Sequence, residues 1–142
     1  MIEVVVNTET LARSKRGKIT GEVFLRHATE EFPDSRWSDF PVVVLTWWID
    51  GIHKLVAGEE NSYVGHFMDG PYKFVAKRRA ESAVSVAWGR VDDEESVREV
   101  DLFALQRSVV AAGQHVVAAC HARGWSSEDL ESLERAISRG AA

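Results

Sequence analysis

The segment from Pro41 to Gly58 constrains the fold of this chain more than any other part of the sequence. Its pattern predicts a helix, with Ser38 or Asp39 as the capping residue, Pro41 in the first turn and Gly58 just after the end. One face carries apolar residues at spacings of four, four and three, namely Val44, Trp48, Ile52 and Leu55. The first half is apolar on its other sides too, through Val43, Leu45, Trp47 and Ile49. We therefore expect that half to be buried nearly all round and the second half to be amphipathic.

Segments with strand character lie on both sides of this helix. They are rich in β-branched residues or alternate between apolar and polar residues, and they cover residues 2–7, 19–29, 61–68, 72–77, 83–91 and 96–100. A hairpin-like turn is expected at Asp69-Gly70-Pro71, with a positive φ at Gly70. A second polar turn is expected at residues 92–95.

Two further helices are expected after the last strand. Asp101 should cap a long helix from Leu102 to about Arg123. Ser126, with Asp129 three residues later, predicts the start of the final helix. The complete order is then β-β-α-β-β-β-β-α-α. Because the strands are grouped and the helices are segregated, this order predicts an α+β fold, an antiparallel sheet with helices packed on one face. Its core should include Trp48, Ile52, Val109 and Val116.

Length and charge restrict the class of protein. A chain of 142 residues is expected to form a single α+β domain, residues 1–142, that buries a core without disulfides or metal. The net charge of −5 argues against nucleic acid as a partner, which would require a basic face. No apolar run approaches the roughly 18 residues of a membrane span, and the first residues lack a secretory pattern. We expect a cytoplasmic protein with no membrane partner, and the oligomeric state stays open.

Residues that carry chemistry do not assemble into a motif. The five histidines lack the spacing of metal ligands. The single cysteine, Cys120, excludes an internal disulfide, and it lies near a helix C-terminus, where the dipole disfavours a thiolate. The signatures of serine hydrolases, dinucleotide-binding folds and phosphate-binding loops are all missing from the sequence. We therefore predict no catalytic residue, no cofactor and no metal site.

The chain holds five tryptophans, which permit two interpretations. Filling the interface between sheet and helices is the favoured one, because aromatic residues dominate core burial. Trp47 and Trp48 point about 100° apart on a helix, so one can enter the core while the other lies at its margin. The alternative is a small ligand-binding or enzymatic domain with a Trp-lined pocket that uses Asp39, Asp50 or His53. A third possibility is a structural homo-oligomer that pairs through a sheet edge or an aromatic face.

Four short segments occur in a characteristic order along the chain. They are Trp37-Ser38-Asp39-Phe40 before the Trp-rich helix, Phe67-Met68-Asp69-Gly70-Pro71-Tyr72, Arg123-Gly124-Trp125, and Asp129-Leu130-Glu131. In this order they resemble small uncharacterised bacterial proteins, some of which are similar to cytoplasmic immunity proteins of polymorphic toxin systems. The resemblance covers residues 20–138 and supplies no catalytic residue. It implies a protein that binds and blocks another protein.

An acidic segment is the candidate contact for such a partner. Between Asp92 and Asp101 the chain carries six acids and one base, so this stretch alone accounts for −5. Asp101 is expected to serve as a helix cap, which leaves Asp92, Asp93, Glu94 and Glu95 as candidate partner-binding residues. The alternative is a solvated turn that only aids solubility. The leading hypothesis is a non-enzymatic binding protein of the immunity or inhibitor type, which occludes a protein partner, such as a basic toxin, through this acidic surface.

Overall fold

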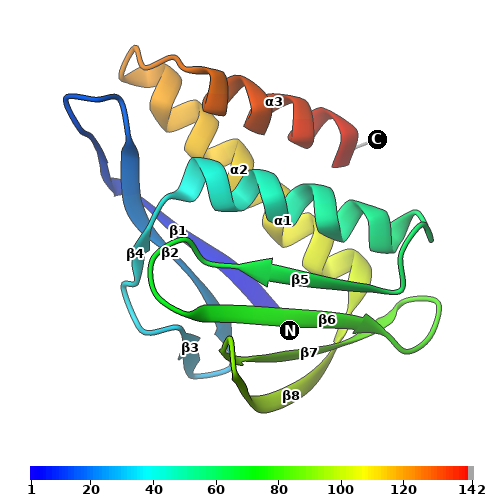
Figure 1. Cartoon of the computed structure of the whole chain (residues 1–142). Coiled ribbons are helices and arrows are strands. Elements are labelled where there is room, and N and C mark those ends of the chain that lie inside the picture. Colours follow the sequence, from blue (N-terminus) through cyan, green and yellow to red (C-terminus); the bar gives the residue numbers. More distant parts are fainter. Residues whose placement is uncertain (141–142) are drawn as a thin grey trace.

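The structure, a computed structural model, describes residues 1–140, with side chains described for all of them except residues 93–97. It shows an α+β fold, as predicted (Figure 1). The elements, in chain order, are β1 (Ile2–Arg13), β2 (Ile19–His27), β3 (Glu30–Phe32), β4 (Ser38–Asp39), α1 (Pro41–Val56), β5 (Ser62–His66), β6 (Tyr72–Arg78), β7 (Ala83–Arg90), β8 (Asp93–Asp101), α2 (Leu102–Ala122) and α3 (Glu128–Gly140). The predicted order holds, with the short strands β3 and β4 added to it.

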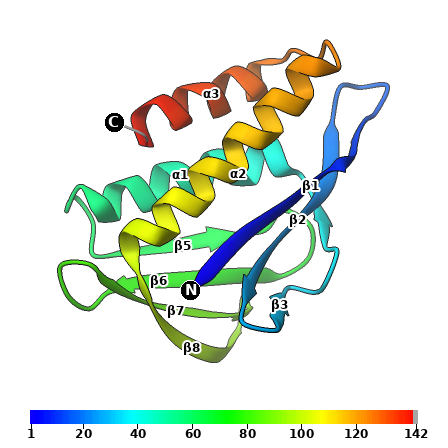
Figure 2. The same cartoon turned by 180° about the vertical axis from the view of Figure 1, so that it is seen from behind.

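The strands divide into two antiparallel sheets, where the sequence predicted one. In the first sheet β1 pairs with β2, which also pairs with the short strands β3 and β4. The second sheet is a meander in the order β5-β6-β7-β8. The division follows from the chain path, because α1 separates the two groups of strands and the hairpin connections stay within each group. Figures 1 and 2 show α1 and α2 lying across one side of the strands, with α3 outermost.

The core is centred on Trp48, which is fully buried. Its ring makes edge-to-face contacts with Phe67 and Phe74 at centroid distances of 5.0 and 5.4 Å. Its indole Nε1 donates a hydrogen bond to the His66 carbonyl at 3.0 Å, so the one polar atom of the side chain is satisfied. Ile52, Val109 and Val116 are also buried, as predicted.

The first half of α1 is buried on several sides because α3 covers the side turned away from the strands. An added Cβ at Gly140 of α3 would lie 2.9 Å from Ile49, and one at Gly113 of α2 would meet the same side chain at the same distance. Small residues on both neighbouring helices therefore allow close packing around α1. Trp47 is the exception, with 43% of its surface exposed.

Two of the predicted caps are wrong and one is confirmed. The N-cap of α1 is Phe40, with no side-chain hydrogen bond, so neither Ser38 nor Asp39 caps this helix. The N-cap of α3 is displaced by one residue, because Ser127 rather than Ser126 accepts a hydrogen bond from the Leu130 N–H, at 3.1 Å. Asp101 caps α2 as predicted, and its carboxylate accepts from Ala104 N–H at 2.8 Å.

The two predicted turns have different outcomes. Gly70 has a φ of +81°, which confirms the positive value expected in the turn between β5 and β6. The polar turn predicted at residues 92–95 is wrong, since β8 already begins at Asp93 and pairs with β7 from there. The chain turns instead at Val91 and Asp92, where the Val91 N–H donates to the Pro71 carbonyl at 2.7 Å. That hydrogen bond continues the pairing of β6 with β7, in which Tyr72 lies opposite Arg90.

Candidate functional site

Asp39 ties the entry of α1 to the turn between β5 and β6. Its side chain is only 2% exposed. Oδ1 accepts hydrogen bonds from the backbone N–H groups of Phe40 (2.7 Å) and Met68 (3.1 Å). Oδ2 accepts from the Trp37 indole N–H and from the Asp69 backbone N–H, both at 3.0 Å. We call this carboxylate with its four donors the Asp39 clamp, and two of the residues that donate to it, Phe40 and Met68, line one cavity.

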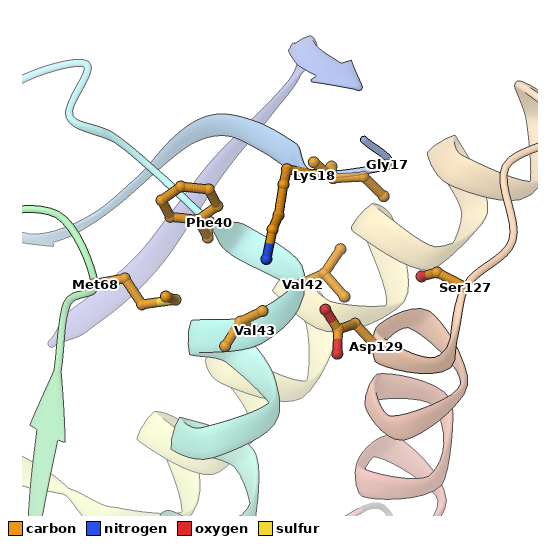
Figure 3. A pocket seen from close by; sticks show the side chains of 9 residues that line it. Gly17, Lys18, Phe40, Val42, Val43, Met68, Ser127 and Asp129 are labelled. Carbon is orange, nitrogen blue, oxygen red and sulfur yellow. The ribbon is translucent and has the colours of Figure 1, made fainter. Parts of the chain in front are cut away.

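That cavity lies at the N-terminal end of α1 and has a volume of about 160 Å³. Its walls come from the loop before β2, the first turn of α1, the β5–β6 turn and the start of α3 (Figure 3). The lining residues are Gly17, Lys18, Ile19, Phe40, Val42, Val43, Met68, Ser127 and Asp129. The walls are mostly apolar, and the charged groups that line them are the Lys18 ammonium and the Asp129 carboxylate.

A wider and shallower groove runs between α1 and the edge strand β5. It has a volume of about 440 Å³ and is lined by Trp47, Asp50, Gly51, Lys54, Glu60, Ser62, Tyr63 and Val64. The Tyr63 ring lies directly against the helix at Gly51, where an added Cβ would come within 2.2 Å of the ring. Burial, and secondly the charge of Asp50, raise the pKa of Tyr63 above its ordinary value. The phenol therefore stays protonated and can donate a hydrogen bond.

A third hollow connects the cavity with the groove. It has a volume of about 180 Å³ and shares Val43 and Asp129 with the cavity, and Trp47 with the groove. Three large apolar side chains are exposed along this path: Met68 by 47%, Trp47 by 43% and Val64 by 40%. We call the surface formed by Val43, Trp47, Val64 and Met68 the α1 face.

The structure does not bring Asp39, Asp50 and His53 into one pocket. Asp39 is buried within the clamp, and Asp50 lines the groove, where its carboxylate accepts a hydrogen bond from Arg139 at 2.9 Å. His53 is half-buried, and its Nδ1 has no partner among the described residues. The geometry needed for shared acid–base work is therefore missing from this set.

The predicted acidic contact lies on the opposite edge of the second sheet from the α1 face. The side chain of Asp92 is exposed in the turn before β8, while those of Asp93, Glu94 and Glu95 lie outside the described residues. Strand β8 is the edge strand farthest from β5 in the order β5-β6-β7-β8. The acidic segment and the α1 face therefore lie at opposite edges of this sheet, as two separate surfaces.

The surroundings of the acidic segment also contain basic groups. The Arg98 guanidinium stacks over the Trp88 ring at 3.7 Å and pairs with Glu30. Burial lowers the pKa of Arg98. It also lowers the pKa of His27, with smaller contributions from the positive N-terminus and from Arg98.

Cys120 and the histidines do not form a reactive or metal-binding group. Cys120 is fully buried, and burial raises the pKa of its thiol, against a smaller opposite effect of Arg123. His121 contacts the Glu134 carboxylate at 2.6 Å on the surface. Among the described side chains, which leave out those of residues 93–97, no three of His, Cys, Asp or Glu converge as metal ligands. No helix in the same part of the chain is long and apolar enough to cross a membrane.

Sequence reasoning missed Lys18 and Met68, and it left Trp47 open, as part of a helix half expected to be buried and as one of two adjacent tryptophans of which one could lie at the margin of the core. The exposure of Trp47 follows from its 100° separation from the buried Trp48, which the sequence indicated. Lys18 lies in a connecting segment with no periodic pattern, and Met68 was expected only as the last residue of a strand, so nothing in the sequence indicated that either lines a cavity.

Comparison with family models, with curated proteins and with solved structures finds no match for this chain.

Proposed function

We propose that this protein is a non-enzymatic binding protein of the immunity or inhibitor type, which blocks a basic protein partner through the α1 face. The observation that carries the proposal is the exposure of Trp47 in the groove between α1 and β5. Tryptophan is enriched among the few interface residues that supply most of the binding free energy, and such residues sit in hollows surrounded by polar groups.

The shape of the α1 face supports this function. Its exposed apolar side chains lie beside three connected hollows, into which side chains of a partner can insert. Contiguous exposed apolar surface marks interaction sites in soluble domains. The helix beneath is rigid, because most of its other residues are packed in the core.

The net charge of the chain, −5, supports a basic partner. The α1 face itself is nearly balanced in charge. Asp50, Glu60 and Asp129 border its hollows together with Lys54 and Lys18, and Asp50 pairs with Arg139. A negative net charge speeds the association with a basic partner and disfavours acidic ones.

The test is the affinity for the protein encoded next to this one, measured with both purified proteins by calorimetry. Trp47→Ala should weaken binding by about 30-fold, the effect of losing one anchor residue worth about 2 kcal/mol. Phe103→Ala is the matched control, since Phe103 is a similarly exposed aromatic residue at the start of α2, with 39% exposure. The control should bind like the parent.

Two outcomes would contradict the proposal. Equal affinity of the parent and Trp47→Ala would show that the α1 face is not the contact surface. A parent protein that sediments as a dimer, and becomes a monomer in Trp47→Ala, would show that this face pairs with a second copy of the chain instead.

A further inference from the structure

The cavity at the N-terminal end of α1 combines an apolar interior with two opposite charges. Figure 3 shows the Lys18 side chain extending over the first turn of α1, so that its ammonium ends between Phe40 and Val42. The Asp129 carboxylate, from α3, lies beside Val42 and Val43. The two charges thus reach the same apolar space from different elements of the fold.

Neither charge is neutralised by a neighbour. In the described part of the chain, the Lys18 ammonium and the Asp129 carboxylate form no ion pair with each other and no hydrogen bond with another side chain. Both therefore stay available to a ligand.

The two charges favour opposite groups on a ligand. The Lys18 ammonium lies over the first turn of α1, which contains no acidic residue, and it favours an anionic group. The Asp129 carboxylate, in the first turn of α3, favours a cationic group. A ligand with one anionic and one cationic group is thus complementary to the cavity as a whole.

The volume limits the size of the apolar part of such a ligand. An apolar cavity of about 150 Å³ holds one benzene molecule, and this cavity measures about 160 Å³. Its apolar walls are formed by Ile19, Phe40, Val42, Val43 and Met68. One branched aliphatic, thioether or single-ring side chain fills this space.

We propose that this cavity binds a free apolar α-amino acid of about the size of leucine. The α-carboxylate pairs with the Lys18 ammonium, the α-ammonium pairs with the Asp129 carboxylate, and the side chain packs between Phe40, Val43 and Met68. Binding is non-covalent and involves no reaction. The inference stands on the cavity alone and does not depend on the proposed protein partner.

The experiment is an NMR titration of the labelled full-length protein with L-leucine and with two analogues that each lack one charge. Leucine should shift the methyl resonances of Met68 and Val43. 4-Methylpentanoate lacks the amine and isopentylamine lacks the carboxylate, so each should bind about tenfold more weakly or worse, the effect of one lost charge-assisted hydrogen bond.

Variants assign the two charges to their residues. Lys18→Met and Asp129→Asn should each weaken leucine binding by about tenfold or more. Lys54→Met and Glu131→Gln are matched controls, because both residues are exposed and neither lines the cavity. All four positions are exposed, so the amide spectrum of each variant should retain the dispersion of the folded parent.

Three results would overturn the inference. The first is an absence of shifts at Met68 and Val43 up to the solubility limit of leucine. The second is an affinity for 4-methylpentanoate or isopentylamine equal to that for leucine, which would show that one charge plays no part. The third is an equal loss of binding in the control variants and in Lys18→Met or Asp129→Asn.

Discussion

Replacing Asp39 by asparagine tests how much the Asp39 clamp stabilises the fold, because the change turns one carboxylate oxygen into a nitrogen. Each oxygen of the Asp39 carboxylate accepts two hydrogen bonds, at distances between 2.7 and 3.1 Å. An asparagine keeps one acceptor oxygen and turns the other into an NH₂ group. Whichever way the amide is oriented, two N–H donors then face another donor in a site that is 2% exposed.

The expected loss in the free energy of unfolding follows from those two unpaired donors. A buried donor without a partner costs about 1–3 kcal/mol, so two of them cost about 2–6 kcal/mol. The lower half of that range applies if the Trp37 indole N–H is one of the two, because Trp37 is only half-buried and reaches water. We therefore expect Asp39→Asn to lower the free energy of unfolding by about 3 kcal/mol.

Urea unfolding followed by tryptophan fluorescence measures this loss. Asp69→Asn is the matched control, since it removes the same charge from the adjacent turn at an exposed position and should change stability by less than about 0.5 kcal/mol. A double-mutant cycle with Trp37→Phe isolates the share of the indole hydrogen bond. A loss below about 1 kcal/mol in Asp39→Asn, or one equal to the control, would refute the assignment of the clamp.

Three other perturbations test the core, the pH response and the acidic segment. Trp48→Ala should cost about 3–5 kcal/mol in urea unfolding, and a loss below about 1 kcal/mol would contradict the burial of its ring. The lowered pKa of His27 means that the unfolded chain takes up this proton first as the pH falls. Stability should therefore decline below about pH 6.5, and a His27→Gln variant with the same pH dependence as the parent would rule out this contribution. Neutralising the four acids of the acidic segment should slow association with a basic partner and flatten its salt dependence, with melting temperature unchanged. Unchanged binding kinetics at low salt would leave a solvated surface as the only role of Asp92, Asp93, Glu94 and Glu95.

The parts of the fold that sequence reasoning predicted are those that depend on neighbours in the chain. Asp101 is the N-cap of α2 because its carboxylate reaches an N–H group only three residues away. Gly70 takes a positive φ because the turn requires it and glycine has no Cβ. The buried face of α1 follows from the period of the helix. Each of these features depends only on residues that are close to one another in the sequence.

The errors arise where a distant segment competes with the local pattern. Asp39 has the residue type and the position of an N-cap, yet its oxygens bind N–H groups 29 and 30 residues away. The division into two sheets and the early start of β8 likewise depend on which strands meet in space. The cavity was not predictable for the same reason, because Lys18 and Asp129 come from loops and helix ends that only the tertiary fold brings together.

The Asp39 clamp explains why a cavity exists at all where an apolar helix begins. A side chain that capped α1 would cover its first turn, and the β5–β6 turn would have no fixed position there. Because Asp39 instead accepts from Met68 and Asp69, that turn is held against the entry of α1, and the exposed Met68 becomes a wall rather than a mobile surface residue. The Phe40 N–H donates to the same carboxylate, and Phe40 lines the cavity as well. The residue type that pattern reasoning assigns to a helix end thus serves here to join two segments that line one cavity.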